Sequence, residues 1–314
     1  MAMFGSTGTT EILAQSLFRM IAGVGAAPVF VMGGVLVATL FPRESKLNSF
    51  AAAVYFGGDG VGMLIAGFVL QNYLYKHFPN GWQMSWGFMG LASCIMLGMI
   101  VWATFQVNDV HNRSELRLSG LRLGIIGPAI TAYFLFSLGY VIYMTFQVSW
   151  LRVNGADAIL ASVVWSLMGV AVVAYPFMWR QVLSQPSAGR AIALTTLTVG
   201  LAALIPLFGC KISVFISSFM FGCAMFVVPK SATNFAKTSV AQPVMGAVVA
   251  LFTLFFSLGQ ILEPISAGYV LDKNADADWL LFLSGSIFSL GTLSALWQSA
   301  IKSPKNTFDS LPKL

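Results

Sequence analysis

Few side chains in this sequence could do chemistry, and three of them interrupt long apolar stretches. Only 9% of the 314 residues are charged, while 57% are hydrophobic. Arg19, Asp59 and Glu263 are the ionisable residues deep inside such stretches. If the stretches cross a membrane, each charge costs about 2.5–3.5 kcal/mol at mid-bilayer, so each should face a cavity or a partner.

Asp59 has two open interpretations. Tyr55 lies four residues before it on the same helical face, and glycines surround it at positions 57, 58, 60 and 62. No strand precedes this GDGVG run, so it does not match a dinucleotide-binding loop, and we expect the glycines to permit tight helix packing. Asp59 could accept a proton, or it could form a structural hydrogen bond to a Tyr or Ser.

Glu263 shares a helical face with Gly259 and Gln260, and this face ends at Pro264. Proline removes one backbone hydrogen bond and kinks a helix, which leaves a carbonyl near the carboxylate. A bent helix with a polar face is a candidate gate. Glu263 could serve as a substrate or proton site, or it could be structural near the outer interface.

A line of polar side chains predicts one wall of a substrate cavity. The steps between its members are four, three, four and three residues, so they share one helical face: Tyr133, Ser137, Tyr140, Met144 and Gln147. If this face contacted lipid, its hydrogen-bonding groups would have no partners, so we expect it to face protein or water. Ser217 and Ser218, with Gly222, could form the opposing wall, although serine in a membrane helix often bonds its own i−4 carbonyl.

The remaining reactive residue types indicate no enzyme. Cys94, Cys210 and Cys223 show no CxxC spacing, so we interpret them as small buried apolar residues. His77 and His111 stand alone in predicted loops, so we expect no metal site, and nothing indicates a cofactor. The sequence shows no GxSxG motif, no paired His or Cys and no DxxD near an interface.

The elements that carry these residues are predicted to be transmembrane helices. The mean hydropathy is +0.81, and nine apolar stretches are each long enough to cross a bilayer, which takes about 20 helical residues. In lipid the backbone must satisfy its own hydrogen bonds, and the short alternating segments of a β-barrel are missing. The fold class is therefore an all-α polytopic membrane protein, with spans at 17–40, 49–72, 83–106, 122–149, 157–179, 190–209, 212–235, 243–270 and 279–301.

Basic residues predict the orientation and the domain division. Alternate connections and the C-terminal tail hold 12 Lys and Arg, and the opposite set holds 4, so the C-terminus is predicted to be cytoplasmic. Residues 107–122 form the longest polar interruption and predict a cytoplasmic linker. It separates a three-helix bundle at 1–106 from a six-helix bundle at 123–314 with a short cytoplasmic tail. No soluble basic surface is large enough for nucleic acid.

Several motifs together resemble the major facilitator superfamily. Arg19 to Ala27 (RMIAGVGAA) is similar to its fourth-helix RxxxGxGxA motif, and residues 176–190 resemble a degenerate copy of its loop between helices eight and nine. Gly139 to Phe146 (GYVIYMTF), with Gly259, Gln260 and Pro264, resembles the YbfB/YjiJ-like branch. The resemblance covers the whole chain.

The resemblance implies that the nine helices correspond to helices 4–12 of a major-facilitator-like bundle, with the first three apparently lacking. It implies a secondary active transporter of a small solute by alternating access in a bacterial inner membrane, with proton coupling left open. Arg19 would then influence coupling or gating, and the alternative is a structural cation paired with a carboxylate or with helix-end carbonyls. Gly23 and Ala27 follow it at helical spacing and would let another backbone approach that face closely. The alternative is a truncated, transport-inactive membrane protein that acts as a sensor or assembly partner. The expected partners are the lipid bilayer, a small-molecule substrate of unassigned chemistry and protons.

Overall fold

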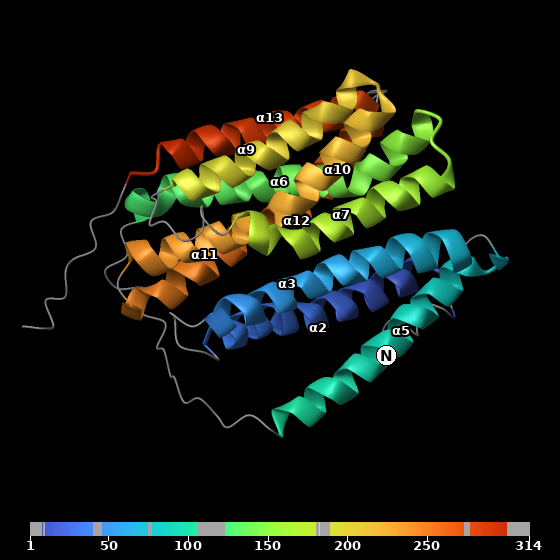
Figure 1. The fold of residues 1–314 in the computed structure, drawn as a ribbon, viewed down its shortest axis with the longest axis horizontal. Helices are drawn as coiled ribbons and strands as arrows, with labels where there is room; N and C mark the ends of the chain where they lie inside the picture. Colours follow the sequence, from blue (N-terminus) through green and yellow to red (C-terminus); the bar gives the residue numbers. More distant parts are fainter. Residues whose placement is uncertain are drawn as a thin grey trace, which may run out of the picture. The chain divides into compact units, whose positions relative to one another are not determined.

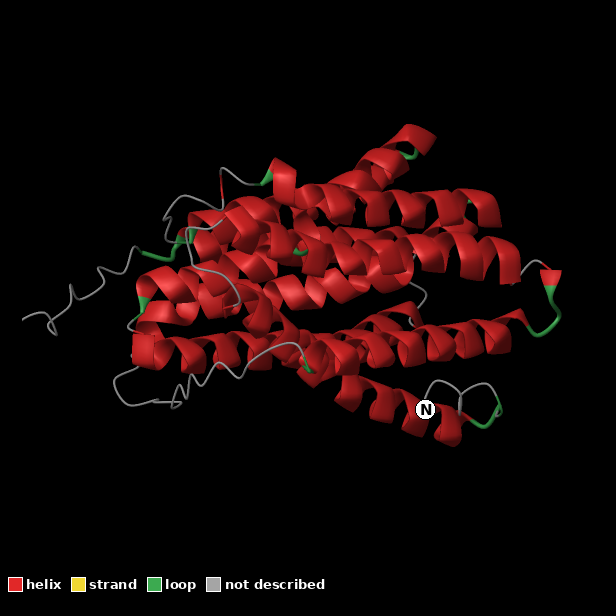
Figure 2. Ribbon diagram, turned by 60° about the horizontal axis from the view of Figure 1, so that its bottom comes forward, coloured by secondary structure: helices red, strands yellow, loops and turns green. Residues whose placement is uncertain are grey.

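The computed structural model confirms an all-helical chain. It describes residues 8, 10–39, 46–74, 77–105, 123–179, 182, 189–240, 242–272 and 277–299. Figure 2 shows helices joined by loops and turns, and no strand occurs among these residues. Helices satisfy their own backbone hydrogen bonds, which is what a lipid environment requires.

Each of the nine predicted apolar stretches is helical over most of its described residues. Figure 1 shows the elements, which are α2 (Ile12–Thr39), α3 (Lys46–Ile65), η1 (Ala66–Leu74), α5 (Gly81–Thr104), α6 (Leu123–Val153), α7 (Ala158–Met178), α9 (Arg190–Leu204), η2 (Ile205–Phe208), α10 (Lys211–Met225), α11 (Val227–Ser239), α12 (Gln242–Asp272) and α13 (Ala277–Leu296). Within the described ranges, seven helical segments are long and apolar enough to cross a membrane. Two shorter apolar segments occur at Ile12–Ala26 and Gly57–Leu70.

Three predicted helices differ from a plain α-helix. The helix predicted at 49–72 changes to a π-helix at Ala66, and the one predicted at 190–209 ends in the 3₁₀ turn η2 before Gly209, whose φ is 71°. The helix predicted at 212–235 is interrupted at Phe226, between α10 and α11. Pro229 explains this break, because it has no N–H for the Met225 carbonyl and its ring crowds that carbonyl.

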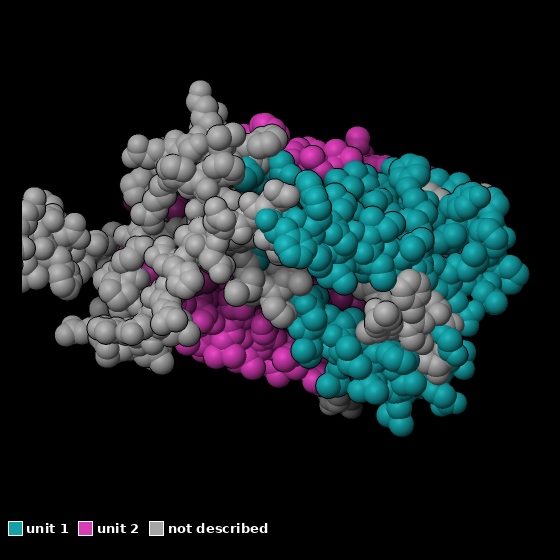
Figure 3. All heavy atoms as spheres, turned by 90° about the horizontal axis from the view of Figure 1, so that it is seen from below, with its two compact units in different colours: residues 1–113, 158–166 teal, residues 114–157, 167–314 magenta. Residues whose placement is uncertain are grey.

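The helices group into two compact units, coloured separately in Figure 3. One comprises residues 1–113 with 158–166, and the other comprises residues 114–157 with 167–314. The predicted linker at 107–122 and the tail beyond residue 299 lie outside the described residues. The domain boundaries therefore stay a prediction.

In the first unit, α2 packs against α3, and α5 packs against η1. A Cβ built on Gly33 of α2 would come within 2.7 Å of the Tyr55 hydroxyl, and one on Gly67 would come within 3.1 Å of the Ser162 carbonyl. By contrast, a Cβ at Gly57, Gly58 or Gly62 would meet nothing within 4 Å. The packing role predicted for the glycines around Asp59 is therefore wrong at these three positions.

In the second unit, α6 packs against α12 and α13, and α9 packs against α10 and α13. Figure 1 shows α6, α9 and α13 lying side by side. Pro128 lies inside α6, and the Pro128 carbonyl accepts a hydrogen bond from Ser294 Oγ at 2.9 Å. The Ala129 N–H donates to Gln298 Oε1 at 3.2 Å. Side chains of α13 and of the residues just after it thus bond the α6 backbone beside Pro128.

Candidate functional site

A fully buried group of polar side chains joins α6 to α10. Gln147 Nε2 donates hydrogen bonds to Tyr143 Oη at 2.8 Å and to Ser218 Oγ at 2.7 Å, and Tyr143 Oη lies 2.6 Å from Ser217 Oγ. Each of the four residues is at most 1% exposed. We call Tyr143, Gln147, Ser217 and Ser218 the polar cluster.

The polar cluster is fixed by helix geometry. Tyr143 and Gln147 lie four residues apart on α6, so their side chains share one face. Ser217 and Ser218 meet them from α10, and Ser217 Oγ donates onward to the Ala202 carbonyl of α9 at 2.6 Å. Three helices of the second unit are therefore linked by one hydrogen-bonded chain.

One end of the Gln147 amide is left without a partner. Gln147 Oε1 is buried and accepts no hydrogen bond from any residue that the structure describes. Reversing the amide would leave the amide nitrogen in that position instead, so one end lacks a partner in either orientation. A buried polar atom without a hydrogen bond costs about 1–3 kcal/mol. The cluster can therefore bind one further hydrogen-bonding group.

Aromatic rings surround the polar cluster. The Tyr143 ring stacks on Phe221 of α10 with centroids 3.9 Å apart, and Tyr140 stacks on the same ring at 6.3 Å. Phe256 of α12 lies 6.2 Å from Tyr140, and Phe288 of α13 lies 6.2 Å from Phe221. An apolar, aromatic surrounding strengthens hydrogen bonds made inside it, because the local dielectric is low.

The polar stripe predicted on α6 has mixed placements. Gln147 joins the predicted residues Ser217 and Ser218 directly. Tyr133 is buried among rings, stacking on Phe256 at 5.2 Å, and Ser137 Oγ donates to the carbonyl of Phe134, three residues before it. Tyr140 and Met144 are half-buried. Whether these residues line a substrate cavity stays a prediction.

Glu263 is buried in α12, and its helical face differs from the one predicted. Gly259, Glu263 and Ala267 form a buried row at four-residue steps, whereas Gln260 is half-buried and Pro264 is exposed. A Cβ on Gly259 would come within 3.1 Å of the Phe134 carbonyl, so α12 approaches α6 closely there. α12 continues through Pro264 to Asp272, and proline leaves the Gln260 carbonyl without its intrahelical donor.

In the first unit, Arg19 and Asp59 are not fully buried by protein. Asp59 is half-buried on α3, and Tyr55 of the same face contacts Gly33 of α2. Arg19 is exposed, and its guanidinium lies over the Trp86 ring of α5, 5.3 Å from the ring centroid. A Cβ on Gly23 would meet nothing within 4 Å, so the close helix approach predicted at this glycine is not found.

Comparison with known families decides the class of the protein. The family model described as "Uncharacterised MFS-type transporter YbfB" matches residues 1–296. The chain belongs to this family. It is a multi-pass membrane protein of the major facilitator type, as its motifs and helices indicated. No curated protein matches the chain.

Sequence reasoning missed Tyr143 in this member of the YbfB family. Tyr143 is 0% exposed and bonds both Gln147 and Ser217, but the polar stripe predicted on α6 contains Tyr140 in its place. The four-residue step from Tyr143 to Gln147 was the available signal. It was ambiguous because Tyr140 also fits the helical spacing, and only the packing of α10 distinguishes the two faces.

The cysteines are placed differently from one another. Cys223 is buried as predicted, whereas Cys94 and Cys210 are exposed, so the prediction is wrong for these two. Cys94 lies on α5, most of whose residues from Leu91 onward are exposed, and Cys210 immediately precedes α10. Within the described residues, no group of three His, Cys, Asp or Glu could hold a metal ion.

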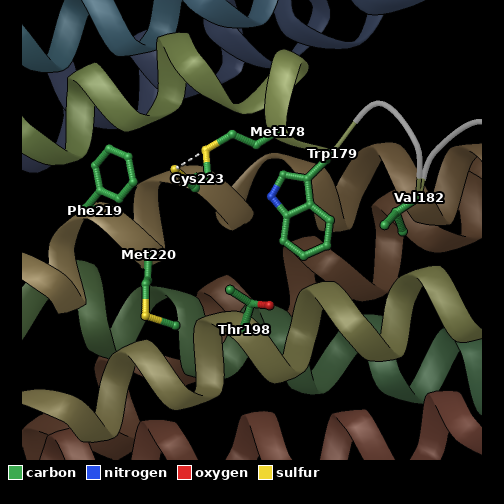
Figure 4. A pocket seen from close by; sticks show the side chains of 7 residues that line it. All are labelled: Met178, Trp179, Val182, Thr198, Phe219, Met220 and Cys223. Atoms are coloured by element: carbon green, nitrogen blue, oxygen red, sulfur yellow. Dashed lines mark hydrogen bonds between the residues drawn. The ribbon is translucent and has the colours of Figure 1, made fainter.

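A pocket of about 260 Å³ lies at the end of α7 (Figure 4), and its described lining includes no residue of the polar cluster. It is lined by Met178, Trp179, Val182, Thr198, Phe219, Met220 and Cys223. A second pocket, of about 270 Å³, lies beside Arg19 and includes Gln15 and Ser16. Neither pocket contains a residue of the predicted α6 stripe.

Proposed function

We propose that this protein is a secondary active transporter that moves a small solute by alternating access. The family match supports a transporter, and the observation that carries the proposal is the polar cluster. Four hydrogen-bonding side chains are buried inside a bundle of apolar helices, where desolvated polar groups are expensive and mark substrate pathways. The unpartnered end of the Gln147 amide then binds a polar group of the solute.

The first test identifies a solute and then replaces two side chains of the polar stripe on α6. Purified protein is screened by thermal unfolding against a library of small solutes, because a ligand that binds only the folded state raises the unfolding temperature. The stabilising solute is then followed in proteoliposomes. Gln147→Ala and Tyr140→Ala should reduce its flux about tenfold or more, equivalent to about 1.4 kcal/mol per lost contact.

The control for this test is Ser286→Ala. Ser286 is half-buried on α13, and among the described residues its hydroxyl bonds the Phe282 carbonyl of the same helix, so its loss should leave flux unchanged. The amount of each variant in the membrane is measured in parallel. Unchanged flux in both Gln147→Ala and Tyr140→Ala would indicate a purely structural role for α6 and would favour the transport-inactive alternative.

We further propose that transport is coupled to protons, with Asp59 or Glu263 as the titrating group. Carboxyl groups inside membrane helices commonly form proton relays, and Glu263 is 0% exposed while Asp59 is half-buried. Substrate-driven pH change in proteoliposomes measures the coupling. Asp59→Asn and Glu263→Gln, singly or together, should abolish the pH dependence of flux.

Asp157→Asn provides the matched control, because Asp157 is exposed in the connection between α6 and α7. It should keep the pH dependence. Full retention of that dependence in the double variant would falsify the assignment to Asp59 and Glu263. Dependence on sodium in place of protons would contradict the choice of coupling ion.

A further inference from the structure

Three sulfur-containing side chains gather at the pocket at the end of α7. Cys223 of α10 contacts Met178 of α7, with the two sulfur atoms 3.2 Å apart, as the dashed line in Figure 4 marks. Met220 lies three residues before Cys223 on α10 and lines the same pocket. Cys223 is 3% exposed, and the pocket gives it access from outside the helix bundle.

This grouping is chemically distinctive. Thiolate and thioether ligands are soft, and they select monovalent copper over the hard cations that prefer oxygen. Among the described residues that line the pocket, none carries a carboxylate or an imidazole. The Met220 thioether points away from Cys223 in Figure 4, but its three rotatable bonds let the side chain adopt other rotamers in the pocket.

Charge balance also selects a monovalent ion. When Cu(I) binds, the thiol loses its proton to solvent and a sulfur–copper bond replaces the sulfur–hydrogen bond. The thiolate and the single positive charge cancel, so the site stays neutral and no net charge enters an apolar region. A divalent ion such as Zn²⁺ would leave one net positive charge there. Trp179 also lines the pocket, and its indole face can stabilise a cation.

We propose that Cys223, Met178 and Met220 form a binding site for a soft monovalent metal ion, Cu(I) or Ag(I). Cys223 supplies the thiolate, and the two methionines supply neutral sulfur ligands from α7 and α10. The site lies apart from the polar cluster and does not depend on transport. Its occupation would link the end of α7 to α10.

The test measures Cu(I) binding directly in purified protein. Copper is offered as its bicinchoninate complex to a Cys94→Ser/Cys210→Ser variant, which retains Cys223 as the single thiol. This variant should bind one Cu(I) per chain, and X-ray absorption should show sulfur ligands. Adding Cys223→Ser should abolish binding. Met178→Leu should lower the affinity for Cu(I) by about 10–100-fold or more, because loss of a residue that only supports a metal ligand already costs that much.

Controls make each outcome decisive. Met99→Leu changes an exposed methionine of α5 and should leave copper affinity unchanged. Thermal unfolding without metal checks that every variant is folded. The proposal is overturned if the variant with Cys223 as its single thiol binds no copper, if Cys223→Ser binds it equally well, or if Zn²⁺ displaces it at equal concentration. An unchanged affinity in Met220→Leu would remove Met220 from the ligand set.

Discussion

Gln147 and Cys210 show how neighbours set the chemistry of single residues in this protein. Gln147 is 1% exposed and has one amide end without a partner among the described residues, so its environment favours an added hydrogen-bonding group. Cys210 is exposed immediately before α10. The Ser213 hydroxyl and backbone N–H both donate to the Cys210 carbonyl, at 2.6 and 3.1 Å, and their polarity beside the thiol holds the pKa of Cys210 below its usual range.

This lowered pKa predicts the reactivity of Cys210. The thiolate is the form that reacts with a maleimide, and the pKa of an ordinary cysteine thiol is about 8.5. Cys210 should therefore react at a lower pH than an ordinary cysteine. Ser213→Ala removes this hydroxyl dipole from beside the thiol and should move the rate profile to higher pH. The pH dependence of labelling, followed in a Cys94→Ser background, measures both. Identical profiles with and without the Ser213 hydroxyl would contradict the stated cause.

At the scale of elements, close helix contacts are made at particular glycines. A Cβ on Gly222 of α10 would come within 2.4 Å of the Met168 carbonyl and 2.9 Å of the Ala171 side chain on α7. A backbone carbonyl cannot move aside as a flexible side chain can. By contrast, a Cβ on Gly127 of α6 would meet nothing within 4 Å. Glycine is therefore required at the first position and not at the second.

The two glycines give a matched stability test. Gly222→Ala should lower the free energy of unfolding by about 1–3 kcal/mol, because α7 and α10 must separate. Gly127→Ala should leave it unchanged or raise it by up to about 1 kcal/mol, because alanine favours the helix over glycine. Thermal unfolding in detergent compares them. Equal unfolding temperatures for both variants would show that α7 and α10 are not in close contact at Gly222.

At the scale of the whole molecule, the basic residues predict which connections face the cytoplasm. The 12 to 4 asymmetry of Lys and Arg places residues 107–122 inside and the connection that holds Cys210 outside. In intact cells, a membrane-impermeant maleimide should therefore label Cys210. It should label an Asn112→Cys variant in a Cys94→Ser/Cys210→Ser background only after the cells are permeabilised. Labelling of that variant in intact cells would reverse the orientation.

The sequence by itself determined the class and the elements. Nine apolar stretches predicted helices, and helices occur at each of them, because a chain in lipid has no other way to satisfy a long run of backbone groups. Motif order along the chain indicated the family. Ser217 and Ser218 were predicted to form a wall opposite the α6 stripe, and Ser218 accepts a hydrogen bond from Gln147 of that stripe.

Tertiary structure decided what spacing could not. Tyr140 and Tyr143 both fit the helical spacing, and the packing of α10 alone brings the hydroxyl of Tyr143 to Gln147 and Ser217. The same packing brings Cys223 to Met178, although 45 residues separate them in the sequence. The distance between two side chains on different helices depends on how those helices pack. Composition and periodicity carry no information about that packing, because they describe each helix separately.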